Sequence, residues 1–199
     1  MSRPSREQVR ARLLAAAAQE FRDRGYAGAR LDVIARAAGF TKGAVYSNFD
    51  SKQGLFTALL AEHTDALLES LLAGVDDVGV DEGVQRVGDT LGARIVADPQ
   101  WHLLVLEFAV QAGREDGVRT AYAAQRRAQR VSLAARVVEQ ARRWGAPGPD
   151  GAAAAQVLLP LLLGLTVEHA ADPAAVGQAE ISAAVVAVLR GLLAAASLS

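Results

Sequence analysis

The 199-residue chain has no cysteine and only two lysines, and arginine supplies every other basic position. Without cysteine there is no disulfide, no thiolate metal site and no cysteine nucleophile, which is compatible with a reducing compartment. The N-terminus is basic but lacks the continuous apolar core of a secretory signal peptide. The most apolar stretch, Val157 to Val167, is shorter than the ~20 residues that span a bilayer. The sequence therefore predicts neither secretion nor a membrane span.

Histidine is also scarce, which limits the catalytic and metal chemistry open to the chain. The three histidines, His63, His102 and His169, fall on different predicted helices. His169 and Asp172 could offer two metal ligands at helical spacing, but a metal site needs more. No phosphate-binding loop, dinucleotide fingerprint or nucleophile elbow occurs. We expect no catalytic residue, no metal and no cofactor.

Charge is unevenly distributed along the chain, although the net charge is only −1. Residues 1–52 hold ten Lys and Arg against five Asp and Glu, whereas residues 53–199 hold eleven against seventeen. A basic N-terminal quarter on an acidic body is typical of a nucleic-acid-binding head on a regulatory or enzymatic body. Charge alone supports a basic solvated surface equally well.

Apolar residues recur at helical spacing through nearly the whole chain, and no run alternates as a strand would. This pattern predicts an all-α protein of about nine helices. The predicted helices span residues 9–24, 31–38, 42–48, 52–73, 84–97, 100–112, 117–144, 152–171 and 180–196. Glycines at 25 and 39 end the first two helices, and residues 74–83 form the expected linker.

Both lysines, Lys42 and Lys52, fall in the first turn of a predicted helix. A helix N-terminus carries about half a positive charge, so a cation there costs roughly 0.3–1 kcal/mol. A bound phosphate offsets this cost, because free backbone N–H groups, the helix dipole and the ammonium all act on it. Two short helices joined by a glycine-containing turn also describe a helix-turn-helix, which reads DNA with its second helix. The lysines therefore predict phosphate contacts.

The short helix that begins at residue 42 has almost no side-chain bulk near its start. Glycine inside a helix costs about 1 kcal/mol relative to alanine, yet Gly43 is followed directly by Ala44. This surface lets the backbone approach DNA closely. Tyr46, Ser47 and Asn48 add groups that can reach phosphates or base edges. The alternative is an exposed, frayed surface helix.

The segment FRDRGYAGARLDVIARAAGFTKGAVYSNFDSKQGLF, Phe21 to Phe56, resembles the DNA-binding head of TetR-family transcriptional regulators. It contains the family's Gly-Tyr after the first helix, Ile-Ala-x-x-Ala-Gly, Lys-Gly-x-x-Tyr-x-x-Phe and Ser-Lys-x-x-Leu-Phe. The match covers roughly the first third of the chain. The resemblance implies phosphate contacts from Thr41, Lys42, Tyr46 and Lys52 and base-facing positions at Gly43 and Ala44.

Two positions depart from the family pattern. The second helix of family members commonly starts with Ser or Thr, which caps the helix and touches phosphate, but here Arg30 precedes Leu31. Arg30 can replace the phosphate contact but not the cap, so this helix should begin less firmly. Gln53 stands where the family usually has Glu.

The resemblance also implies the domain organisation and the partners. We expect a helix-turn-helix DNA-binding domain at residues 6–52 (the motif proper at 30–49), a connecting helix at 53–73, and an effector-binding and dimerisation domain at 84–199. The expected function is a cytoplasmic, prokaryotic, ligand-responsive repressor. It would associate with the nucleoid by binding a pseudo-palindromic double-stranded DNA operator, from which a small effector releases it. The alternative is a helical small-molecule-binding protein or enzyme without DNA-binding activity.

The helix that begins near Trp101 is apolar nearly all round, which predicts burial in the second domain. Under the resemblance it forms one wall of an effector cavity. The residues expected to contact the effector are Trp101, His102, Val105, Phe108, Tyr122 and Arg126. The alternative for the aromatic residues is a core position, and for the polar ones a surface or internally bonded position. An inward-facing arginine from residues 117–144 would favour an anionic effector.

The last two predicted helices, near 152–171 and 180–196, are expected to form a homodimer interface. They carry more apolar surface than a single chain of this size hides easily, and their small residues permit close helix packing. The alternative is that both helices belong to the core of one chain.

Overall fold

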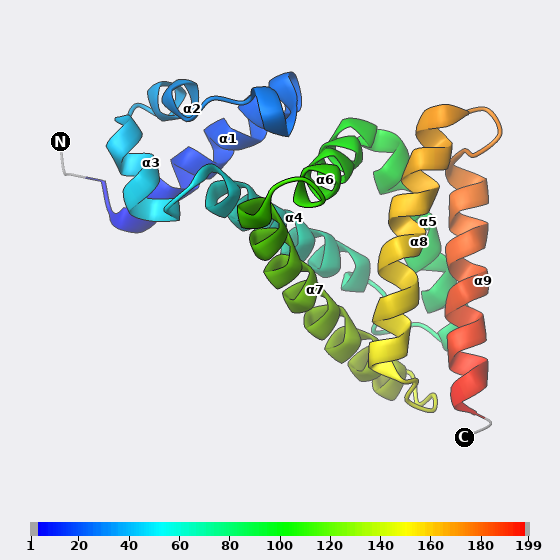
Figure 1. Cartoon of the computed structure of the whole chain (residues 1–199). Helices are drawn as coiled ribbons and strands as arrows, with labels where there is room; N and C mark the ends of the chain where they lie inside the picture. The colour runs from blue at the N-terminus through cyan, green and yellow to red at the C-terminus, as the bar shows by residue number, and fades with distance from the viewer. Residues whose placement is uncertain (1–3, 198–199) are drawn as a thin grey trace. The chain divides into compact units, whose positions relative to one another are not determined.

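The computed structural model describes residues 4–197, and every regular element in that range is an α-helix. The helices in chain order (Figure 1) are α1 (Arg6–Gly28), α2 (Leu31–Ala37), α3 (Lys42–Phe49), α4 (Lys52–Leu72), α5 (Val80–Ala97), α6 (Pro99–Ala112), α7 (Asp116–Arg143), α8 (Gly151–Ala171) and α9 (Gln178–Ala196). The predicted all-α fold is confirmed.

The chain forms two compact units. The first, called here the head unit, runs to His63 and includes Leu104–Gln125; the second, the body unit, comprises Thr64–Leu103 and the chain from Arg126 onward. Helices α4, α6 and α7 therefore each contribute residues to both units. The head unit differs from the predicted 6–52 domain because it also contains the ends of α6 and α7 that carry Phe108 and Tyr122.

Helices α1, α2 and α3 pack together in the head unit around buried apolar side chains, among them Leu13, Phe21, Ile34 and Val45. Ser5 starts α1 with a capping box, in which its hydroxyl accepts from Gln8 N–H. The predicted glycine breaks are both present: Gly25 has φ +70° near the end of α1, and Gly39 has φ +79° between α2 and α3. These left-handed conformations favour glycine.

Five aromatic side chains form one cluster in the head unit. Phe56 lies 4.8 Å from Phe21 and 4.5 Å from Phe108, centroid to centroid. Phe108 in turn lies 4.6 Å from Tyr26 and 5.6 Å from Tyr122. Phe21, Phe56 and Phe108 are fully buried. These distances suit favourable edge-on ring contacts, so the cluster is a major part of the head-unit core.

In the body unit, α5 packs closely against α9, and α8 runs beside α9 (Figure 1). Two glycines allow the close approach of α5. A Cβ on Gly88 would lie 2.6 Å from Val186 Cγ2, and a Cβ on Gly92 would lie 2.6 Å from the Gln178 carbonyl oxygen. Larger side chains at either position would push the two helices apart.

The predicted linker at residues 74–83 is too long, because α5 begins at Val80 rather than residue 84. The sequence pattern places Gly83 in the linker because glycine disfavours helix, but this residue lies inside α5 and has a packing role there. A Cβ there would lie 2.3 Å from the Trp144 ring. Trp144 is held in place because its indole N–H donates to the Val75 carbonyl at 2.9 Å. The connection between α4 and α5 covers residues 73–79, and within it Gly74 has φ +78°.

Helices α8 and α9 are each long and apolar enough to cross a bilayer, judged by length and composition alone. The expectation of no span rested on the continuous run at 157–167, but alanines extend the apolar segment to the whole of α8. Core helices of soluble proteins have the same property. Only 22% of each apolar window is buried within the chain, so much of this surface is uncovered in one copy.

Candidate nucleic-acid interface

Helix α3 is divided cleanly into a buried and an exposed side. Val45 and Phe49 are 1% and 5% exposed and face the head-unit core. The predicted DNA-binding residues occupy the other side of the same helix. Thr41, Lys42, Gly43, Tyr46 and Ser47 are exposed, and Ala44 and Asn48 are half-buried. The structure therefore brings together the α3 residues that the sequence selected.

The N-terminus of α3 combines a positive helix end with uncommitted polar groups. Thr41 is the N-cap residue with an extended backbone, but its side chain makes no capping hydrogen bond. The exposed Lys42 ammonium lies 5.8 Å from the centre of the Tyr46 ring. The first N–H groups of a helix have no partners within that helix, so this end suits an anion such as phosphate.

The protein itself does not require glycine at position 43. A Cβ built there would meet only Thr41 Oγ1 at 3.7 Å, which is an ordinary contact. Gly54 at the start of α4 is different, since a Cβ there would lie 2.1 Å from the Phe49 carbonyl oxygen. Gly43 therefore leaves α3 open to something outside the chain.

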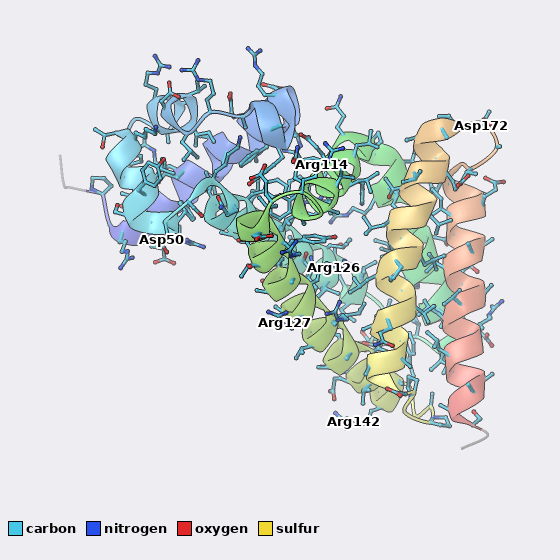
Figure 2. The ribbon with its side chains drawn as sticks, in the orientation of Figure 1. Asp50, Arg114, Arg126, Arg127, Arg142 and Asp172 are labelled. Carbon is cyan, nitrogen blue, oxygen red and sulfur yellow. The ribbon has the colours of Figure 1, made fainter. Side chains whose placement is uncertain are left out.

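The polar side chains in the second half of α3 are partly used within the helix. Ser47 Oγ donates to the Ala44 carbonyl at 3.1 Å, and Asn48 Nδ2 donates to the same oxygen at 2.8 Å. Helix α3 ends at Phe49, and the next residue, the C-cap residue Asp50, has φ +61° and is labelled in Figure 2. The Ser51 hydroxyl then accepts from Gly54 N–H at 3.0 Å and so supports the start of α4.

Arg30 precedes α2 without a side-chain cap, as the sequence predicts. Its guanidinium instead makes two bonds to Asp32, with Nε to Oδ1 at 3.2 Å and Nη2 to Oδ2 at 3.1 Å. Arg36 Nη2 also lies 3.4 Å from Asp32 Oδ2. The Arg30 contact is the main cause that lowers the pKa of Asp32. The three side chains form an exposed cluster with one excess positive charge, which suits a second phosphate contact.

Lys52 has a structural contact that the sequence did not reveal. It begins α4 as predicted, but its ammonium donates to the Ala27 carbonyl at 3.0 Å and lies 5.0 Å from the Tyr26 ring centre. Burial lowers the pKa of Lys52, although nearby Glu107, Glu115 and Glu20 oppose the shift. A cation is favourable at the carboxyl end of a helix, so Lys52 stabilises the end of α1.

Glu107 binds the same end of α1 from α6. Its carboxylate accepts from Tyr26 N–H at 2.8 Å and from Ala27 N–H at 2.9 Å. A Cβ on Gly25 would lie 2.6 Å from Glu107 Oε2, so this glycine provides both the backbone turn and the space for the carboxylate. Sequence reasoning did not assign this role, and the only available signal was a single carboxylate on an otherwise apolar helix.

Glu107→Ala should destabilise the head unit by about 1.5–3 kcal/mol, because hydrogen bonds to a charged group are lost and two backbone N–H groups are left without this acceptor. Chemical unfolding followed by circular dichroism measures the change. Glu62→Ala, an exposed carboxylate on α4, is the control and should change stability by no more than about 0.5 kcal/mol. Equal effects of the two variants would rule out the assigned role of Glu107.

The body unit contains an apolar cavity of about 140 Å³. Leucine and valine side chains from α4, α5, α7, α8 and α9 form most of its wall. A few polar residues, Thr64, Gln129, Arg136 and Gln140, also line it. Such a largely apolar cavity with a few polar groups is typical of a small-molecule site.

The six predicted effector residues do not line this cavity. Phe108 and Tyr122 belong to the aromatic cluster, Trp101 is 3% exposed and Val105 is half-buried. His102 Nδ1 lies 3.0 Å from the Asp98 carbonyl oxygen, and burial lowers the pKa of its ring. Arg126 donates to Gln129 Oε1 at 3.3 Å. The spacing of residues along α6 and α7 could not reveal which sides of these helices face the cavity.

The possible ligand pair at His169 and Asp172 is instead part of a helix end. His169 Nδ1 lies 2.8 Å from the Val176 carbonyl oxygen, and Asp172 accepts from the N–H groups of Ala174 and Ala175. Among residues 4–197 there is no group of three or more side chains placed to hold a metal ion.

Residues 13–59 match the family model described as "Bacterial regulatory proteins, tetR family". Over 70 residues, 35% of this chain and 32% of the relative, the sequence is 41% identical to the HTH-type transcriptional activator FasR of Mycolicibacterium smegmatis. Over 81 residues it is 37% identical to the regulator SrpR of Pseudomonas putida, covering 41% and 37% of the two chains. The matched segment thus spans about a third of each curated relative.

The fold likeness extends over nearly the whole chain. A TetR-family regulator from Rhodococcus sp. aligns with a TM-score of 0.76 and 20% identity, covering 94% of this chain and 99% of that one. FadR from Bacillus subtilis, whose structure contains stearoyl-CoA, aligns with a TM-score of 0.65 and 17% identity, covering 90% and 96%. At these identities the likeness shows the fold.

Proposed function

Because this chain belongs to the TetR family of bacterial regulatory proteins, we propose that it is a sequence-specific, ligand-responsive transcriptional regulator that binds DNA as a homodimer. The observation that carries this proposal is the exposed side of α3. It presents a positive helix end, the side chains of Lys42 and Tyr46, and Gly43, a glycine that the protein does not need for its own packing. This combination fits a recognition helix in the major groove.

Lys42→Ala should weaken binding to all DNA sequences to a similar degree and reduce the salt slope by about one or less, because it removes one phosphate contact. Fluorescence anisotropy over a range of salt concentrations measures both quantities. Arg127→Ala, an exposed change on α7 with the same loss of charge, is the control. Unchanged DNA binding by Lys42→Ala would contradict the phosphate assignment.

Lys52→Ala has a different expected signature. Its ammonium holds the Ala27 carbonyl, so this variant should lose stability as well as DNA affinity, whereas Lys42→Ala should lose only affinity. Lys52 is proposed to contact phosphate from the start of α4 while it remains bound to α1. Thermal unfolding and DNA titration of both variants together distinguish the two roles. Loss of both stability and DNA affinity in Lys52→Ala supports the bridging role, whereas loss of stability alone shows a purely structural one.

The uncovered apolar surface of α8 and α9 is proposed to form the dimer interface. Val157 and Val167 on α8 are 45% and 39% exposed, and Ala183 and Ala187 are exposed on α9. The exposed surface of these helices also carries Gln156, Glu168 and Arg190. Charged groups are costly in lipid but tolerable at the rim of a protein interface, so a second copy is the better partner.

Val157→Glu combined with Val167→Glu should convert the dimer to a monomer, because four like charges would be buried across a symmetric interface. Light scattering at micromolar concentration measures the mass. Val131→Glu is the matched control, since Val131 is 72% exposed on α7 and lies outside the proposed interface. A wild-type protein that is monomeric under these conditions would contradict the dimer.

Regulation is proposed to act through the cavity of the body unit. Helix α4 begins with Lys52 in the head unit, and its later residues, including Leu68 and Leu72, line the cavity. A ligand that changes the packing of this part of α4 can thereby alter DNA affinity, and a coupling of about 1–3 kcal/mol gives a several-fold to hundredfold change. We propose a repressor that the ligand releases; transcription from an operator-bearing promoter in vitro, with and without ligand, tests the sign.

A further inference from the structure

We infer that the cavity of the body unit binds a small neutral hydrocarbon of about the size of a benzene ring and discriminates against charged or hydroxyl-bearing molecules of that size. The inference rests on the proposed ligand-responsive function and names the ligand class for that site. Two properties of the cavity carry it: a volume of about 140 Å³ and a surface that is almost wholly apolar.

Aliphatic side chains from five helices form the wall of the cavity. Its lining includes Leu68 of α4, Leu91 of α5, Leu133 of α7, Leu158 of α8 and Val185 of α9. The four of these that lie on α4, α5, α8 and α9 are at most 7% exposed. An apolar molecule placed here leaves water and gains dispersion contacts with carbon atoms of all five helices.

The polar residues of the wall present almost no polar surface to the cavity. Gln129 Nε2 donates to Thr64 Oγ1 at 2.8 Å, and the indole N–H of Trp144 donates to the Val75 carbonyl at 2.9 Å. Arg136 contributes carbon atoms of its side chain to the wall and not its guanidinium. A carboxylate, amine or hydroxyl group of a ligand would therefore lose its hydration in this cavity without gaining a partner.

The volume of the cavity limits the size of the ligand. An apolar cavity of about 150 Å³ in another protein binds benzene or xenon. The cavity of the body unit is close to that volume, so it suits a molecule of about six or seven carbon atoms. Protein interiors contain few voids larger than a water molecule, because the atoms around a void lose dispersion contacts. A hydrocarbon of this size restores those contacts along the cavity wall.

The experiment compares toluene with phenol by calorimetric titration of the full chain, because a methyl and a hydroxyl group differ in polarity but little in size. Wild type should bind toluene about tenfold or more tightly than phenol, since the hydroxyl group finds no partner in the cavity. Naphthalene is more apolar than toluene but has a second fused ring. It should bind more weakly than toluene, because the cavity is too small for two rings.

Two variants of α7 test the site by changing the cavity volume in opposite directions. Val137→Phe fills part of the cavity and should reduce toluene affinity about tenfold or more. Leu133→Ala enlarges the cavity and should raise naphthalene affinity about tenfold or more. Val131→Phe, on the same helix but at a position that is 72% exposed, is the matched control and should leave toluene affinity within about twofold of wild type. Circular dichroism checks that each variant folds, and Leu133→Ala alone carries the test if Val137→Phe does not.

Any of four results would overturn the inference: no binding of toluene, a phenol or naphthalene affinity equal to or above that of toluene in wild type, an unchanged toluene affinity in folded Val137→Phe, or no gain of naphthalene affinity in Leu133→Ala. Titration of DNA-bound protein with toluene separates this inference from the proposed function. If the protein binds DNA but not toluene, the ligand class is wrong and the regulator stands. If toluene binds in the cavity without any change in DNA affinity, the ligand site stands and the regulatory proposal fails.

Discussion

Gly43→Leu is expected to reduce affinity for the operator about 100-fold or more while the free protein becomes slightly more stable. The structure provides room for the side chain, because the nearest atom to a Cβ at this position is Thr41 Oγ1 at 3.7 Å. Leucine is a better helix former than glycine by about 0.8 kcal/mol, so α3 itself should become more stable. If the variant stays stable but no longer binds DNA, the leucine obstructs the approach to DNA and does not disturb the fold.

The expected affinity loss follows from the proposed role of Gly43 and Ala44, which is to form the closest approach of α3 to the bases. A leucine there would hold α3 away from the groove and leave mainly non-specific phosphate contacts, which are typically at least ~10³-fold weaker. Gel-shift titration and thermal unfolding give the two readouts. Gly54→Ala is the contrasting variant: its Cβ would lie 2.1 Å from the Phe49 carbonyl oxygen, so stability and DNA binding should fall together. Full operator affinity in Gly43→Leu would show that α3 does not approach DNA at this point.

Phe108→Ala is expected to cost about 3–5 kcal/mol of unfolding free energy, the usual range for removing a buried phenyl ring. Phe108 is fully buried and contacts Tyr26, Phe56 and Tyr122, which lie on three other helices of the head unit. Both the transfer of the ring to water and the cavity left behind contribute to the loss. Urea unfolding measures the change.

The control for this prediction is Val110→Ala on the same helix, where the valine is 49% exposed and the expected loss is at most about 0.5 kcal/mol. Phe108→Leu should lie between the two, because leucine fills part of the space. A loss below about 1 kcal/mol for Phe108→Ala would mean that the ring is not a central element of the core, and would return it to the predicted role of an effector contact.

Local patterns predicted the helices well because each is encoded by apolar spacing and by glycine breaks such as Gly25 and Gly39. The start of α5 was misplaced for a tertiary reason. Gly83 is a helix breaker by local propensity, but it lies inside α5 because only glycine fits against Trp144, 61 residues away in sequence. A single sequence contains no information on that distant contact.

The candidate site shows the same difference between features set by neighbouring residues and features set by contacts between distant segments. The α3 surface was predictable because its residues are neighbours in sequence and share one short helix. The contacts of Lys52 with Ala27 and of Glu107 with Tyr26 join segments 25 and 81 residues apart, and the cavity is assembled from five helices.

The central claim is that the exposed side of α3 reads a specific DNA sequence, and selection of bound fragments from fragmented genomic DNA of the source bacterium tests it most directly. The purified wild-type protein should enrich a pseudo-palindromic motif with half-sites about 34–36 Å apart or somewhat more, and Gly43→Leu should enrich none. No enriched motif from the wild-type protein, or the same motif from both proteins, would contradict the account.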